Sequence, residues 1–145
     1  MKTKSVHVLL LLFAVSIFPS CRKEKTSSRN TQLLTQESWQ YDQFGIDEDL
    51  DGQIDIISDI EDCAKDDEVK FHDGGNGQFD QGDILCDPGH PQTQNFDWEF
   101  HTNETQLEYG GTVHHLLKLD ESELIIYTEE ENGANTVRHI LTYKH

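Results

Sequence analysis

The sequence predicts an all-β domain of eight antiparallel strands, arranged as an up-and-down barrel or a curled sheet, with a short N-terminal helix. From residue 38 onward, segments rich in β-branched and aromatic residues alternate with clusters of turn-forming residues. The later connections are only two to four residues long, which suits hairpins. Phe96, Trp98 and Phe100 alternate with polar residues, as in a strand with one buried face.

Residues 1–20 are predicted to be a signal peptide, because two lysines precede an apolar run over residues 6–18. That run is too short to span a bilayer comfortably. An apolar core, the small residue Ser20 and then Cys21 resemble the lipobox of bacterial lipoproteins. The resemblance implies that Cys21 carries lipid and anchors the protein to a bilayer. The alternative is ordinary secretion, which leaves Cys21 as an odd thiol.

The polar, serine-rich residues that follow Cys21 predict a flexible tether, so lipidated cysteine and tether occupy residues 21–30. The β domain is predicted to cover residues 31–145, enough chain for one core and no second domain. Asn30 as a cap and a pair of leucines predict one or two helical turns over residues 30–36.

The charge excludes one class of partner. Residues 1–20 contain two lysines and no acidic residue, so the remaining chain has 9 basic and 28 acidic residues, a net charge of −19. Such a surface repels nucleic acid and anionic headgroups, and it attracts cations. We therefore predict no nucleic-acid binding.

Cys63 and Cys86 are predicted to close a β-hairpin with a disulfide, because the midpoint between them falls at Gly74/Gly75, inside the glycine-rich turn at residues 73–77. Lipidation of Cys21 leaves these two cysteines as a pair. A register that puts the cysteines directly opposite each other would place Phe71 and Phe79 on opposite faces. We therefore expect an offset of one residue or a bulge.

The interior of an eight-stranded barrel holds its own side chains or one small ligand. We expect a packed core here, because the predicted strands are short. The predicted strands are residues 38–44, 68–72, 78–85, 95–101, 106–109, 112–119, 123–129 and 136–143. The predicted core residues are Trp39, Tyr41, Phe71, Phe96, Trp98, Phe100, Leu117, Ile126 and Leu141.

Residues 47–58 follow the pattern of an EF-hand calcium loop, with Asp at positions 1, 3, 5 and 9, Gly at 6 and an apolar residue at 8. Alternate carboxylates on a tight turn converge on a hard cation, and a backbone carbonyl at position 7 adds a ligand. The predicted calcium ligands are Asp47, Asp49, Asp51, Gln53 and Asp55.

The loop departs from the EF-hand pattern at position 12, where Ser58 replaces the bidentate Glu, so we expect weak affinity. Asp59, Glu61 and Asp62 are the candidates for the missing ligand. The alternative interpretation is a solvated acidic insertion around a glycine turn.

The sequence contains no GxSxG or HExxH motif, so it gives no sign of a catalytic serine or of a zinc protease. It offers no free cysteine as a nucleophile either, because Cys21 is assigned to the lipid and the other two cysteines to the disulfide. His114 and His115 are neighbours on one strand and face opposite sides. His115 and His139 are expected on inward faces, where they would meet each other and a ligand or a metal. The alternative is that they form hydrogen bonds in or near the core. We predict that the protein is not an enzyme.

Several features of the sequence occur together: Leu33 and Leu34 before Trp39, the segment from Cys63 to Asp67, Phe71 before a glycine-rich turn, Cys86, Trp98 and the closing Leu-x-Tyr run. In this combination the sequence resembles the small lipocalin-like lipoproteins of Gram-negative bacteria. The resemblance implies a lipocalin-like domain on a lipid anchor in the cell envelope, at the outer membrane, facing the periplasm or the cell surface. It supplies no catalytic residue.

We therefore expect a monomeric binding or structural module that contacts the bilayer through Cys21 and binds calcium. A small apolar ligand is the candidate partner if the module acts in binding. The alternatives are a calcium- or histidine-dependent cell-envelope enzyme and an inhibitor or adhesion module.

Overall fold

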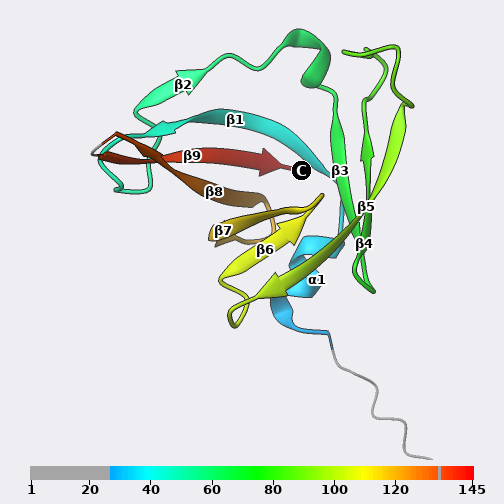
Figure 1. The fold of residues 1–145 in the computed structure, drawn as a ribbon. Helices are drawn as coiled ribbons and strands as arrows, with labels where there is room; N and C mark the ends of the chain where they lie inside the picture. The colour runs from blue at the N-terminus through cyan, green and yellow to red at the C-terminus, as the bar shows by residue number, and fades with distance from the viewer. Residues whose placement is uncertain (1–26, 134) are drawn as a thin grey trace, which may run out of the picture.

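A computed structural model describes residues 27–133 and 135–145, which form one antiparallel sheet of nine strands and a short helix (Figure 1). The predicted signal peptide and the predicted lipidation site, Cys21, lie outside the described residues. The helices are α1 (Arg29–Thr35) and the 3-10 turn η1 (Asp62–Ala64). The strands are β1 (Trp39–Asp47), β2 (Ile56–Ser58), β3 (Glu68–His72), β4 (Asn76–Asp80), β5 (Thr93–His101), β6 (Gln106–Tyr109), β7 (Thr112–Leu119), β8 (Glu123–Asn132) and β9 (Asn135–Lys144).

Eight of the strands close into a ring. Each strand from β3 to β9 pairs with the next one along the chain. β1 closes the ring, because its start pairs with β3 at Trp39 and Val69 while its other edge pairs with β9. The predicted all-β, up-and-down architecture with a short N-terminal helix is confirmed. β2 is the additional strand, and it pairs with the far end of β1.

Several boundaries differ from the prediction by a few residues, and two of these differences have a local cause in the hydrogen bonding. α1 begins at Arg29, because the Ser28 side chain caps it by accepting a hydrogen bond from Thr31 N (3.1 Å), and Asn30 lies inside the helix. β4 ends at Asp80, where the prediction continued to residue 85. The Asp80 carboxylate accepts a hydrogen bond from Gly82 N (3.1 Å), and Gly82 has a φ of +64°, so the chain turns away from the sheet there.

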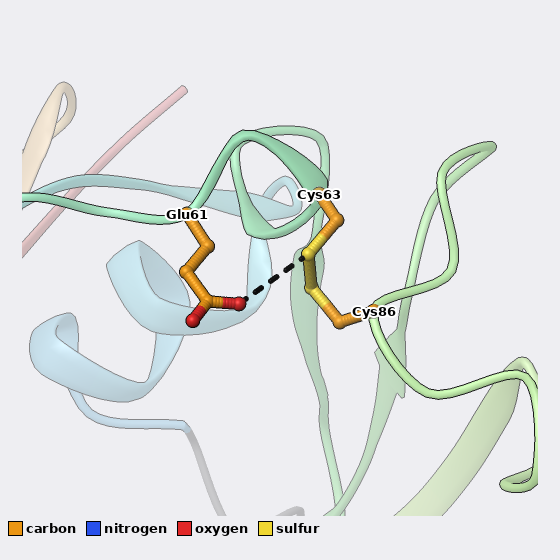
Figure 2. Close-up of side chains that lie close together, drawn as sticks. All are labelled: Glu61, Cys63 and Cys86. Atoms are coloured by element: carbon orange, nitrogen blue, oxygen red, sulfur yellow. Dashed lines mark hydrogen bonds between the residues drawn. A yellow bond between two sulfur atoms is a disulfide. The ribbon is translucent and has the colours of Figure 1, made fainter.

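The predicted disulfide is present between Cys63 and Cys86, whose Cα atoms are 5.1 Å apart (Figure 2). The hairpin register is offset by one residue, as expected, because Val69 lies opposite Phe79 and both side chains share the inner face. The cysteines consequently lie beyond the paired residues, one in η1 and one in the loop after β4. The disulfide therefore joins η1 to the loop after β4 and does not join two strands.

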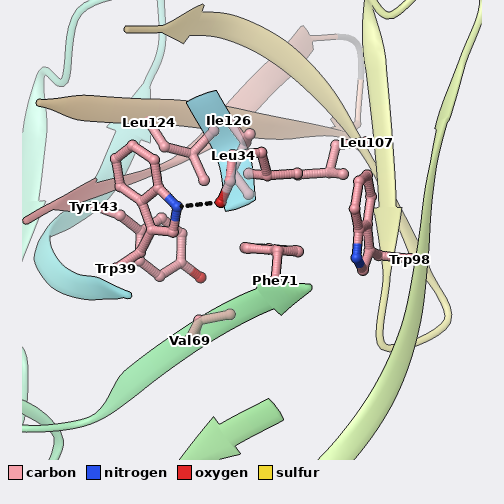
Figure 3. Packing of buried hydrophobic residues seen from close by; sticks show 9 residues of the cluster. All are labelled: Leu34, Trp39, Val69, Phe71, Trp98, Leu107, Leu124, Ile126 and Tyr143. Carbon is pink, nitrogen blue, oxygen red and sulfur yellow. Dashed lines mark hydrogen bonds between the residues drawn. The ribbon is translucent and has the colours of Figure 1, made fainter. Parts of the chain in front are cut away.

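The core fills the ring with aromatic and aliphatic side chains (Figure 3). Trp39 is fully buried, and its indole N–H donates to the Leu34 carbonyl (2.9 Å), which holds α1 against the ring. The Phe71 ring meets Trp98 edge-on at 5.8 Å. The core cluster consists of Leu34, Trp39, Val69, Phe71, Trp98, Leu107, Leu124, Ile126 and Tyr143. Of the other predicted core residues, Tyr41, Phe96, Phe100 and Leu141 are partly buried against this cluster.

The prediction was wrong for Leu117, which is 41% exposed. β7 has a bulge between Leu116 and Lys118, and Leu116 lies opposite the buried Ile126. Leu116 therefore packs on the core while Leu117 lies outside. A bulge changes which residues face inward, and alternation in the sequence does not reveal it.

The same register corrects the histidine prediction. His115 precedes the inward Leu116, so it lies on the outer face, where it stacks on Tyr127 at 4.9 Å. His139 shares the inner face with Leu141 and contacts Glu130 Oε2 at 2.7 Å. His115 and His139 therefore do not meet. The inward histidine of β7 is His114, and burial lowers the pKa of its imidazole.

Three tyrosines bring hydroxyl groups into the interior. The Tyr109 and Tyr143 hydroxyls are 2.7 Å apart and share a hydrogen bond. Burial raises the pKa of Tyr41, Tyr109 and Tyr143 above the usual range of a phenol. These hydroxyls therefore stay protonated at neutral pH and act as a neutral hydrogen-bonding group.

Asp67 is a buried carboxylate at one end of this interior, with 5% of its surface exposed. Its Oδ1 has no hydrogen-bond partner among the described residues. Burial, and then the negative charges of Asp66 and Asp80, raise the pKa of Asp67. The Asp67 carboxyl group therefore binds its proton more tightly in the folded state than in the unfolded state.

We expect Asp67→Asn to raise the free energy of unfolding at pH 7. Because the folded pKa of Asp67 is raised, its carboxyl contributes most stability below the unfolded pKa and loses that contribution as pH rises through the folded pKa. The advantage of Asp67→Asn should therefore shrink as pH falls toward 4. Urea unfolding across this pH range measures it. If the difference in unfolding free energy between Asp67→Asn and the unaltered protein were the same at all pH values, the raised pKa of Asp67 would be contradicted. The matched control is Asp73→Asn, which makes the same change at an exposed position.

Candidate metal centre

The acidic loop connects β1 to β2. Asp47 is the last residue of β1. The two strands are antiparallel, with Ile46 opposite Ile56 and Phe44 opposite Ser58. The base of the loop is closed by Asp55 N, which donates to the Ile46 carbonyl (2.8 Å). A side chain at Gly45 would come within 2.4 Å of the Ile56 carbonyl, so only glycine lets β2 approach β1 this closely. The sheet therefore holds both ends of the loop.

Within the loop, carboxylates accept hydrogen bonds from backbone amides. Gly52 N donates to Asp47 Oδ2 (2.9 Å), Asp51 N to Asp49 Oδ1 (3.1 Å) and Gln53 N to Asp51 Oδ1 (2.8 Å). Gly52 has a φ of +88°, which favours glycine at the bend. These bonds turn three carboxylates toward one another, and one oxygen from each of Asp47, Asp49 and Asp51 lies within 4.8 Å of the others.

Asp47 is the most informative member of this group. Its side chain is 0% exposed, and its Oδ1 has no hydrogen-bond partner among the described residues. The nearest cation is Arg138, whose Nη1 lies 3.8 Å from Asp47 Oδ2, the oxygen that already accepts from Gly52. A buried carboxylate oxygen without a partner is costly, and a cation at this position would remove that cost.

Arg138 holds the loop to the sheet, and sequence reasoning missed it. It lies opposite both Asp47 and Glu129, on the outer face of β9. Its Nη1 donates to the Leu50 carbonyl (2.9 Å), and its Nε contacts Glu129 Oε1 at 3.2 Å. The guanidinium also lies over the Tyr127 ring, 4.6 Å from the centroid. The loop thus has a defined conformation supported by a side chain 88 residues away in sequence.

Asp55, the fourth predicted aspartate ligand, lies outside the three-carboxylate group, whereas Gln53 was predicted to contribute its backbone carbonyl. Asp55 Oδ2 accepts a hydrogen bond from Glu48 N (2.8 Å), which ties the two ends of the loop. The Gln53 side chain donates to Asp51 Oδ2 (2.9 Å). Ser58, at position 12, belongs to β2. Of the four predicted aspartate ligands, the structure therefore brings together Asp47, Asp49 and Asp51.

Glu61, a candidate for the missing twelfth ligand, lies instead beside the disulfide (Figure 2). Its Oε2 is 3.7 Å from Cys63 Sγ. Because both cysteine sulfurs are joined in the disulfide, they offer no thiolate to a metal, and Glu61 with Cys63 and Cys86 is not a metal site.

Two further findings bear on function. No protein-family model matches this sequence, and no curated protein matches it either. Neither helix in the described part of the chain is long and apolar enough to cross a membrane.

Proposed function

We propose that the protein is a lipid-anchored, exported module of lipocalin-like form that acts in binding or as a structural component, and that calcium orders its acidic loop. The lipid anchor is proposed from Cys21 after an apolar segment at the chain start, and the location from the resemblance to outer-membrane lipoproteins. The ring of β-strands and the disulfide are compatible with an extracytoplasmic protein.

The observation that carries the calcium proposal is the environment of Asp47. Carboxylates on a surface stay hydrated and repel each other only weakly. Asp47 is fully buried and its Oδ1 has no hydrogen-bond partner among the described residues, so its negative charge is costly unless a cation binds there. Asp49 and Asp51 supply further oxygens at the same place, and oxygen is the ligand that Ca²⁺ prefers. The amide hydrogen bonds orient these carboxylates without using Asp47 Oδ1.

We expect calcium to raise the melting temperature of the purified protein in a concentration-dependent manner. With the millimolar to submillimolar dissociation constant of extracellular calcium modules, 10 mM calcium should stabilise the fold by about 1.5–3 kcal/mol relative to EDTA. Differential scanning calorimetry over a calcium series measures this shift. The double variant Asp49→Asn/Asp51→Asn should lose it, because asparagine keeps the acceptor oxygens of the loop but removes two charges.

The matched control is Glu48→Gln, which removes one charge from the same loop at an exposed position outside the carboxylate group. It should retain the calcium response. An unchanged melting temperature at 10 mM calcium, or an equal response in the double variant, would refute calcium binding by this loop and leave a solvated acidic insertion.

A further inference from the structure

A second group of side chains that could hold a metal ion lies on the hairpin of β5 and β6. Figure 1 shows this hairpin, which is separate from the loop between β1 and β2. Glu99 lies directly opposite Glu108 in this hairpin, and His101 is two residues from Glu99 on the same face. The opposite face of the hairpin carries Trp98, which packs in the core. The buried face therefore holds the strands in place while the three polar side chains share the outer face.

The donor atoms of these residues converge. His101 Nε2 is 2.8 Å from Glu108 Oε2 and 3.4 Å from Glu99 Oε1, and one atom from each residue lies within 4.8 Å of the others. Ligand atoms around a tetrahedral ion with bonds of about 2.0–2.2 Å are separated by about 3.4 Å. The spacing between His101 and Glu99 already matches this value, and a shift of roughly 0.6 Å would bring Glu108 to it.

The charges at this place favour a cation. Two like charges directly opposite each other on neighbouring strands destabilise a sheet. Among the described residues, Glu99 and Glu108 have no lysine or arginine partner, and their only basic contact is His101. A single imidazole between two carboxylates carries at most one positive charge, so at least one negative charge stays uncompensated.

Solvent can reach the group. Glu99 and Glu108 line a cleft of about 780 Å³, bounded by the start of α1, the turn between β3 and β4, and the turn between β5 and β6. Its described lining holds three more carboxylates and the aromatic residues Trp98 and Phe100, but no lysine or arginine. An ion bound between the two glutamates would have coordination positions left for water or for a ligand in the cleft.

The geometry points to a second metal site, formed by Glu99, His101 and Glu108, for a divalent transition-metal ion such as Zn²⁺. An imidazole with two carboxylates is a ligand set for such ions, whereas the all-oxygen group at Asp47 suits calcium. This inference goes beyond the proposed function and does not depend on the calcium loop.

Calorimetric titration of the purified protein with Zn²⁺, with calcium present to occupy the acidic loop, tests it. His101→Gln and Glu108→Gln should each weaken zinc binding at least tenfold, since loss of even a supporting residue at a metal site typically costs roughly 10- to 100-fold. The matched control is His139→Gln, because His139 contacts a single carboxylate, that of Glu130, at 2.7 Å. It should leave the affinity unchanged.

Glu108→Gln removes one of two opposed charges and should keep the fold, which a thermal melt verifies. NMR of the unaltered protein adds a readout without mutation, because zinc should shift the imidazole resonances of His101 and not those of His139. The absence of zinc binding, or equal binding by the unaltered protein and the Glu108→Gln variant, would overturn the site. Asp49→Asn/Asp51→Asn should retain zinc binding, so failure of either metal proposal is distinguishable from failure of the other.

Discussion

Replacing Trp39 with alanine should lower the free energy of unfolding by about 4 kcal/mol, within the range for deleting a buried aromatic side chain. Trp39 is fully buried where β1 meets β3 and closes the ring. Its N–H also donates to the Leu34 carbonyl and so connects α1 to the sheet. The substitution therefore removes apolar contacts, leaves a cavity and frees the helix at the same time. Urea unfolding followed by far-UV circular dichroism measures the loss.

Trp39→Phe separates these effects. Phenylalanine keeps most of the apolar contact but cannot donate to Leu34, so we expect a loss of roughly 1–2 kcal/mol. If Trp39→Ala lowered the free energy of unfolding by less than about 1 kcal/mol, Trp39 would not be important for holding β1 against β3. Leu117→Ala is the control, because Leu117 lies on the surface and should change stability little.

Removing the disulfide should have the second largest effect. The double variant Cys63→Ser/Cys86→Ser frees a loop that spans 23 residues in sequence, and the chain-entropy model gives a loss of about 3 kcal/mol. For a domain of this size that loss corresponds to a fall in melting temperature of roughly 10 °C. Thermal melts followed by circular dichroism measure it.

The unaltered protein treated with a reducing agent should show the same fall, and the double variant should not respond to the reductant. A variant as stable as the unaltered protein would mean that the hydrogen bonds from Asp83 N and Ile84 N to Asp66 Oδ2 (2.7 and 3.2 Å) hold the loop after β4 without the disulfide. The calcium response of the double variant should persist, because the acidic loop is anchored by β1, β2 and Arg138.

The two proposed metal sites lie on the outside of the ring, supported by residues that pack inward. Asp47 and Arg138 lie on the outer face of neighbouring strands, and Glu99 and Glu108 do so elsewhere in the sheet. The substitutions proposed for the metal sites therefore leave the core cluster intact. Changes in metal binding can thus be measured separately from changes in folding.

Local patterns in the sequence were sufficient to predict the fold class, most strands, the disulfide and the acidic loop. Turn chemistry acts over a few residues, and alternation reports one buried face, as at Phe96, Trp98 and Phe100. The two cysteines have their midpoint inside the turn at residues 73–77, and this placement predicted a disulfide that the structure contains. The aspartate spacing likewise identified Asp47, Asp49 and Asp51, which the structure brings together.

Only the tertiary structure decided which faces and which distant residues meet. The bulge in β7 places Leu117 outside and His115 on the outer face, because one extra residue reverses the alternation that a sequence pattern assumes. The pairing of β1 with β9 places Arg138 beside Asp47, and the pairing of β5 with β6 places Glu108 opposite Glu99. These positions depend on the register between strands, which is set by packing across the whole ring and is not encoded in any short segment.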